Sequence, residues 1–130
     1  MEARMRYMTK TPSESDEQAT LFAWADMMKA RWPELELMFH IPNGGSRHPL
    51  EAVHLKRLGV KPGVPDIFLP VARGDYHGLW IEMKRQTNSR LSDYQKDMIQ
   101  RLICQRYRVA VCHGFEEARN IITLYLEGRL

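Results

Sequence analysis

The amino-acid sequence predicts a mixed α/β domain with the element order α-β-α-β-β-α-β-α. Segments that begin with a capping residue and end near glycine or proline alternate with short apolar runs typical of strands. The chain has 130 residues, of which 44% are hydrophobic, and this is enough for one core. We therefore expect a flexible N-terminal arm at residues 1–12 and a single domain at residues 13–130.

The first helix is predicted over residues 14–31. Ser13 is a suitable N-cap, and Asp16 three residues later completes a pattern that resembles a capping box. Pro33 marks the end of the helix. Apolar residues at helical spacing predict the face that packs on the core, namely Leu21, Phe22, Ala25, Met28 and Trp32.

The remaining elements follow from the spacing of apolar residues and turn residues. Residues 35–41 alternate enough to predict a strand that ends at "PNGG". Residues 49–59 predict a short helix, with Gly59 as its C-terminal stop. Further strands are predicted at residues 66–71, 78–84 and 108–113, and further helices at residues 91–107 and 115–128.

The composition restricts the location and the partners of the chain. The net charge is +3, from 19 basic and 16 acidic residues, which permits an anionic partner without requiring one. Cys104 and Cys112 lie in apolar surroundings and are too few for a disulfide framework, so we expect buried free thiols in a reducing cytoplasm. No stretch resembles a leader peptide or reaches the length of a membrane span. These observations predict a soluble cytoplasmic protein.

The two strands at residues 66–71 and 78–84 carry charged side chains where apolar ones are expected. Glu82 and Lys84 share a strand face because they are two residues apart, and pairing of the strands would bring Asp66 beside Glu82. Adjacent carboxylates repel unless a cation lies between them, and Mg²⁺ prefers oxygen ligands. A lysine beside them can orient a water or stabilise charge on a phosphate oxygen. The pattern predicts metal-assisted phosphodiester hydrolysis, although acids at strand ends are also common as solvated edge residues.

Other polar residues are candidates for binding nucleic acid, each with a structural alternative. Gln95, near the start of its helix, could hold a metal-bound water or a phosphate, or be an ordinary surface residue. The segment "IPNGGSRH" could bring backbone N–H groups close to a phosphate, or form an ordinary turn. The basic candidates for DNA contact, which are otherwise only solvated, are Arg47, His48, Lys56, Arg57, Lys61, Arg85 and Arg90.

Several segments agree, in order, with one known family. Between residues 13 and 124 the chain resembles the VRR-NUC (virus-type replication-repair nuclease) family of the PD-(D/E)XK nuclease superfamily, in "SESDEQATLFAWA", "FHIPNGGSR", "GVKPGVPDIFLPV", "HGLWIEMK", "LSDYQKDMI" and "RVAVCHGFEEA". The resemblance implies a restriction-endonuclease-like core and a Mg²⁺- or Mn²⁺-dependent endodeoxyribonuclease of DNA repair or recombination. Small stand-alone members, common in bacteriophages, resemble Holliday-junction resolvases and act as homodimers, which implies branched DNA and a second copy as partners.

The resemblance also implies roles for individual residues. Asp66 and Glu82 match the metal-binding acids, and the backbone carbonyl of Met83 would add a third ligand. Lys84 matches the catalytic lysine, and Gln95 matches the glutamine of the family's helix.

The family's glutamate on the N-terminal helix has two candidate matches in this chain. Glu14 is the better match because it shares a stripe with Gln18, its partner one turn later, and with the apolar core positions. Glu17 is the alternative, on the adjacent face beside Leu21 and Trp24. Either would add a metal ligand.

Two other functions are compatible with the sequence. One is a non-catalytic DNA-binding module, and the other is a metal-dependent nuclease that acts on flap or linear duplex DNA. Cleavage assays on different DNA structures would separate them.

Overall fold

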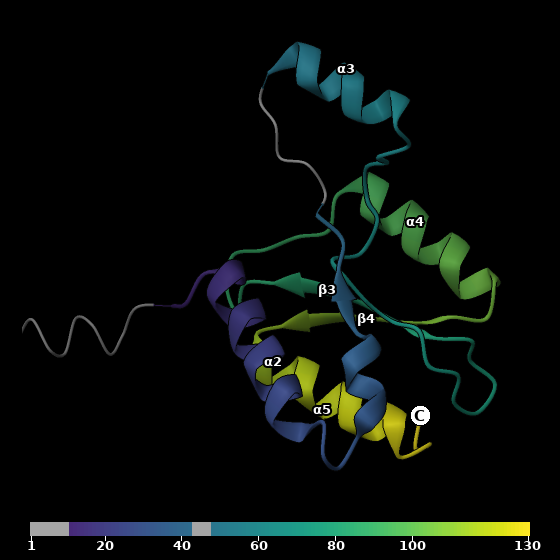
Figure 1. The fold of residues 1–130 in the computed structure, drawn as a ribbon. Coiled ribbons are helices and arrows are strands. Elements are labelled where there is room, and N and C mark those ends of the chain that lie inside the picture. The colour runs from purple at the N-terminus through teal and green to yellow at the C-terminus, as the bar shows by residue number, and fades with distance from the viewer. Residues whose placement is uncertain (1–10, 43–47) are drawn as a thin grey trace, which may run out of the picture.

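The computed structural model describes residues 11–42 and 48–130, and it confirms the α/β class (Figure 1). Its four-stranded sheet has the order β1 (Phe39–His40), β2 (Ile67–Leu69), β3 (Leu79–Lys84) and β4 (Arg108–His113). The first three strands pair antiparallel, whereas β3 and β4 run parallel because α4 (Asp93–Cys104) connects them.

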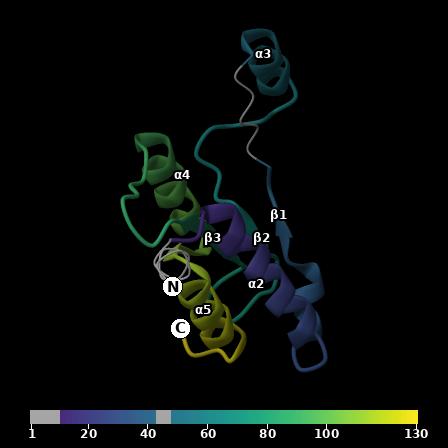
Figure 2. The same ribbon diagram turned by 90° about the vertical axis from the view of Figure 1, so that its left-hand side faces the viewer.

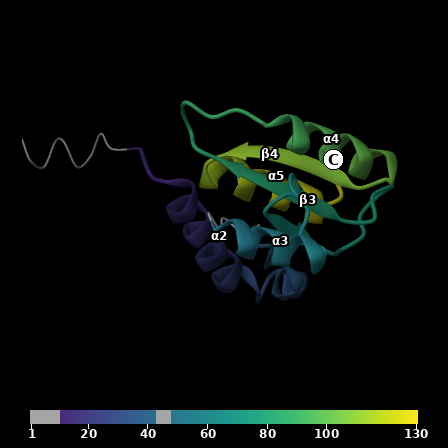
Figure 3. The ribbon, with the colours of Figure 1, turned by 90° about the horizontal axis from the view of Figure 1, so that it is seen from above.

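Helices α2 (Glu14–Met28) and α5 (Phe115–Leu126) cover one face of this sheet, with α5 beneath β3 and β4 (Figure 3). Ser13 and Asp16 form the predicted capping box at the start of α2. The alternation of β3 sends Leu79, Ile81 and Met83 into this layer, where each is almost completely buried. The core therefore lies between the sheet and these two helices.

The opposite face of the sheet is less completely covered. Here α4 packs over β4, and none of its residues is fully buried. Trp80 and Phe68, opposite each other on β3 and β2, stack with ring centroids 4.2 Å apart. Glu82 and Lys84 follow Trp80 on the same face, so they lie where the apolar layer ends.

Helix α3 (Pro49–Arg57) stands apart from the rest of the fold (Figure 2). The Nδ1 atom of His48 caps its start by accepting the Leu50 N–H. At its end Gly59 has a φ of +98°, and the Val60 N–H donates to the Leu55 carbonyl across that glycine. The helix thus has caps at both ends, although none of its residues is buried.

The expected strand at residues 35–41 is wrong over most of its length. Pro33–Leu37 forms a 3₁₀ helix, η1, and only Phe39–His40 pairs with β2. Pro33 favours helical φ at the first position, and the Leu35 N–H donates to the Trp32 carbonyl. Of the alternating apolar side chains, Leu35 is buried, whereas Leu37 and Phe39 are exposed, and Met38 at the cap of the 3₁₀ helix is buried as well.

Smaller differences also have local causes. The first helix ends at Met28 rather than at residue 31, and the Arg31 N–H then donates to the carbonyl three residues before it, as in a 3₁₀ turn. Strand β2 ends before Pro70, which has no N–H to donate. Cys104 is exposed at the end of α4, so its expected burial is wrong, whereas Cys112 is buried as expected. In the described part of the chain, no helix has the length and apolarity to cross a membrane.

Candidate active site

A pocket of about 500 Å³ opens at the end of β3 and gathers residues from separate elements. It receives Glu14 from the first turn of α2, Asp66 from the turn before β2, and Gln95 from the first turn of α4. Glu82 and Lys84 of β3 line it as well. The structure therefore brings together five residues from four separate segments of the sequence.

Asp66 is held on both its backbone and its side chain. Its carbonyl accepts the Ile41 N–H at 2.7 Å and lies 2.8 Å from Nδ1 of His40, which must carry the proton to donate to it. Its Oδ2 atom accepts the Met83 N–H at 2.8 Å. These bonds fix the carboxylate against β3, next to Glu82.

Glu82 is a buried acid, only 4% exposed. Burial raises the pKa of Glu82 to about 8, and the negative charge of Asp66 and a hydrogen bond with it act in the same direction. The charge of Lys84 opposes this pKa shift, and the charge of Glu14 adds to it. Glu82 therefore retains its proton at neutral pH when no cation balances the two acids.

Gln95 connects the two charged residues of β3. Its Nε2 donates to Oε1 of Glu82 at 3.0 Å, and its Oε1 accepts Nζ of Lys84 at 3.2 Å. The same oxygen accepts the Ser92 N–H at 2.8 Å, in a capping box at the start of α4. The cap fixes the amide so that its donor faces the carboxylate and its acceptor faces the ammonium.

The rim of the pocket includes a close contact between a turn and a helix. Gly63 has a φ of +86°, and a Cβ added there would lie 2.4 Å from the Tyr94 carbonyl oxygen. Only glycine allows this approach, because it has no Cβ. The turn before Asp66 therefore packs directly against the first turn of α4.

Comparison with known protein families places the chain in one of them. The family model of the VRR-NUC domain matches residues 6–116. The chain belongs to the VRR-NUC family. A solved structure described as "VRR_NUC domain protein" is 32% identical and superposes with a TM-score of 0.79, covering 91% of each chain. A search of curated proteins finds no match.

Membership in the VRR-NUC family implies a nuclease of the PD-(D/E)XK type, with DNA as its substrate. It also agrees with the observed mixed sheet flanked by helices. The residue pattern in the superfamily's name occurs here as Pro65–Asp66 and, on β3, as Glu82, Met83 and Lys84. Of these residues, Asp66, Glu82 and Lys84 line the pocket.

The donor set of this VRR-NUC domain fits a hard divalent cation. Two adjacent carboxyl groups, of which Glu82 has a raised pKa, offer oxygen ligands, and a cation between them would remove their repulsion. Among the described residues, however, no group of three or more His, Cys, Asp or Glu side chains is placed to hold a metal ion. Backbone carbonyls and waters would have to complete the coordination.

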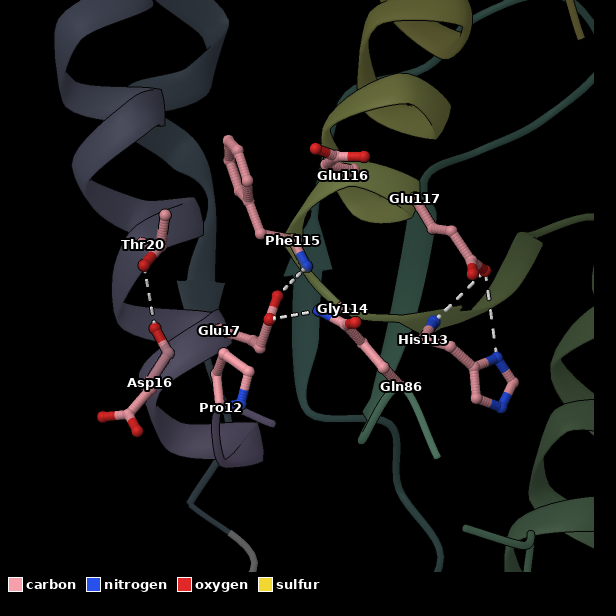
Figure 4. Close-up of a pocket in the computed structure, with 10 residues that line it drawn as sticks. All are labelled: Pro12, Asp16, Glu17, Thr20, Gln86, His113, Gly114, Phe115, Glu116 and Glu117. Atoms are coloured by element: carbon pink, nitrogen blue, oxygen red, sulfur yellow. Dashed lines mark hydrogen bonds and ion pairs between the residues drawn. The ribbon is translucent and has the colours of Figure 1, made fainter. Parts of the chain in front are cut away.

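The two candidate glutamates of α2 lie in different pockets. Glu14 lines the pocket of Asp66 and Glu82, whereas Glu17 lines a second one of about 540 Å³ at the start of α5 (Figure 4). The carboxylate of Glu17 accepts the Phe115 N–H and, at 2.8 Å, Nε2 of Gln86. This placement favours Glu14 over Glu17 as the residue facing the acids.

Among the basic candidates that lie in the described residues, Arg90 alone lines the VRR-NUC pocket. Lys56 and Arg57 are exposed on α3, Lys61 is exposed just after it, and Arg85 is exposed beyond β3. His48 is the N-cap of α3, Gln18 is half-buried on α2, and Arg47 lies outside the described residues, as does most of the glycine-rich segment.

Tyr94 and His40 were not among the sequence candidates. Tyr94 lies on the pocket rim and is 67% exposed, and His40 supports the Asp66 backbone. Their places depend on how α4 and β1 pack, which no local pattern predicts. The bridge made by Gln95 has a partial sequence signature, since Ser92 and Gln95 have the spacing of a capping box.

Proposed function

We propose that this VRR-NUC domain, at residues 13–130, is a divalent-metal-dependent endonuclease that hydrolyses phosphodiester bonds in DNA. The observation that carries the proposal is the buried Asp66–Glu82 pair, with Lys84 and Gln95 beside it in an open pocket. A purely structural role would not explain two adjacent acids, one of which has a pKa raised by burial and by the charge of the other.

In this proposal Asp66, Glu82 and the Met83 carbonyl hold Mg²⁺ or Mn²⁺, and Glu14 contributes directly or through water. The bound cation supplies Lewis-acid chemistry that polarises the scissile phosphate. The ammonium of Lys84 orients the attacking water and stabilises the negative charge that develops on the phosphate. Gln95 holds that ammonium by its Oε1 and the carboxylate of Glu82 by its Nε2.

The DNA backbone would be held by positively charged side chains. Arg90 lies in it, and Lys56, Arg57 and Lys61 lie on and after the projecting helix α3. Phosphate contacts of this kind give affinity without sequence readout. Arg47, His48 and Arg85 complete the set of proposed DNA contacts.

The finer parts of the proposal rest on the family resemblance. They are a Holliday-junction-like substrate, a homodimer that presents two sites, and action in the cytoplasm. Exposed apolar side chains on α3 and at its end, with Leu50 75% and Leu58 68% exposed, are compatible with contact to a second copy. Sedimentation equilibrium would return twice the mass of 15.3 kDa for a dimer, and that mass itself for a monomer.

The test is cleavage of labelled four-way-junction, flap and linear duplex DNA by the wild-type protein with Mg²⁺, Mn²⁺ or EDTA. Metal-dependent cutting supports the nuclease proposal, and preference for the junction supports its finer form. Preference for flap or duplex DNA would favour the alternative substrates. Binding without cleavage under all conditions would contradict the proposal and favour a non-catalytic DNA-binding module.

A further inference from the structure

Glu17 is a buried acid that the proposed reaction does not use. Only 6% of it is exposed, and both carboxylate oxygens accept a hydrogen bond. One donor is the backbone N–H of Phe115, the first residue of α5, and the other is the Gln86 side chain beyond the end of β3. One side chain thus joins the first turns of two helices to the strand that carries Lys84 (Figure 4).

The surroundings of Glu17 are shaped to admit this carboxylate. The N-cap of α5 is Gly114, which has no side chain to cap the helix, so Glu17 supplies the missing acceptor from α2. Gly114 has a φ of +100°, and a Cβ there would lie 3.1 Å from Oε2 of Glu17 and 3.0 Å from Cγ of Gln86. The Gly114 N–H also donates to the Lys84 carbonyl at 3.2 Å.

Glu17 lies three residues after Glu14, and both belong to the first turn of α2. Residues three apart are neighbours on a helix surface, and a terminal helical turn frays unless something holds it. Ser13 and Asp16 hold the backbone of this turn through the capping box, but those bonds do not attach it to the sheet. The two bonds of Glu17 make that attachment.

We infer that Glu17 is a positioning residue, which holds the first turn of α2 against the end of β3 so that Glu14 faces Asp66 and Glu82. The inference rests on the proposed function, because it gives Glu14 a part in holding the cation. It assigns Glu17 no contact with metal or DNA. The pocket around Glu17 then supports the structure of the pocket that contains Asp66 and Glu82.

The test is Mn²⁺ affinity of the full-length chain, measured from the electron paramagnetic resonance signal of free Mn²⁺, at a temperature where every variant is folded. Glu17→Gln keeps the shape of the side chain but places its amide N–H against one of the two N–H donors that Glu17 accepts. We expect about tenfold weaker Mn²⁺ binding, as for other residues that support metal ligands. Combining it with Glu14→Gln should weaken binding no further than Glu14→Gln alone, because both changes remove the same contribution.

Two further variants complete the design. Gln86→Leu removes one donor to Glu17 from the other side and should weaken Mn²⁺ binding in the same direction, which keeps the test valid if Glu17→Gln does not fold. Glu116→Gln removes a charge from the same pocket wall but leaves both bonds of Glu17 in place, so it should bind Mn²⁺ as the wild type does.

The outcomes separate the inference from the proposed function. A lower melting temperature with unchanged Mn²⁺ affinity would make Glu17 merely structural and overturn the inference. Additive losses in the double variant would overturn it too, since Glu17 would then act independently of Glu14. If Asp66→Asn and Glu82→Gln bind Mn²⁺ as the wild type does, the proposed metal site itself fails.

Discussion

At the scale of single residues, the site consists of two adjacent acids and the hydrogen-bonding groups that fix their positions. Asp66 is fixed by the Met83 N–H, and Glu82 is fixed by Gln95. Neither bond removes the cost of placing two carboxyl groups side by side at the edge of the core, and the raised pKa of Glu82 expresses that cost. Strain of this kind is typical of functional sites.

The raised pKa of Glu82 predicts how Glu82→Gln changes stability without metal. Because the pKa rises from 4.5 to about 8 on folding, the folded state binds the proton more tightly. The wild type therefore loses free energy of unfolding as the pH rises from 4.5 to about 8. Glutamine has no proton to lose and still accepts from Gln95, so we expect Glu82→Gln to be more stable by about 1–2 kcal/mol above pH 8, allowing for solvent screening.

Urea unfolding of both proteins in EDTA, at pH values on either side of this window, measures the effect. The advantage of Glu82→Gln should shrink at low pH, where the wild-type carboxyl group is protonated in both the folded and the unfolded state. An advantage that is the same at every pH would show that Glu82 does not carry the raised pKa.

At the scale of elements, the site depends on how turns and helix ends approach the sheet. The first turns of α2 and α4 bring Glu14 and Gln95 to the end of β3. The contact of Gly63 with the Tyr94 carbonyl joins the turn before β2 to α4. Correct placement of the side chains therefore requires close backbone packing.

Gly63→Ala tests this packing, with Gly59→Ala as its matched control. Both glycines have a positive φ, of +86° and +98°, so alanine carries a similar backbone cost of about 1 kcal/mol at each. Only at Gly63 would the new Cβ meet backbone, 2.4 Å from the Tyr94 oxygen, and we expect an additional loss of about 1–3 kcal/mol. Equal melting temperatures for the two variants would contradict the close contact.

The sequence was sufficient to predict the order of most elements and the meeting of Asp66 with Glu82 and Lys84. Strand alternation alone places Glu82 and Lys84 on one face, and pairing of neighbouring strands brings Asp66 to them. The alternating pattern was misleading at residues 35–41, because a 3₁₀ turn there buries Leu35 and Met38, three residues apart, and leaves Leu37 exposed. Local periodicity does not separate these two cases.

The contacts of Gln95 and Glu17 were beyond prediction from the sequence for a different reason. Each depends on the angle at which a helix meets the sheet, which is a property of packing between distant segments. The sequence favoured Glu14 over Glu17 because Glu14 shares a stripe with Gln18, but only the tertiary structure shows which pocket each acid lines.

At the scale of the whole molecule, one face of the sheet is densely packed and the other is more open, and the two faces have different roles. The sheet with α2 and α5 forms the core, while the opposite side carries the candidate site, the partly covering α4 and the projecting α3. The acids lie at the boundary between these layers, with one side supported and the other accessible to a phosphate. Such an arrangement suits a VRR-NUC nuclease that must admit the DNA backbone.

The most direct test of the account is the cleavage rate of Lys84→Ala at saturating protein with Mg²⁺, on the DNA structure that the wild type cuts fastest. Lys96→Ala is the control, since it makes the same change at an exposed lysine of α4. We predict a loss of at least about 100-fold for Lys84→Ala, with DNA and Mn²⁺ still bound, and a near wild-type rate for Lys96→Ala. Cleavage by Lys84→Ala at the wild-type rate would contradict the assignment of this pocket as the active site.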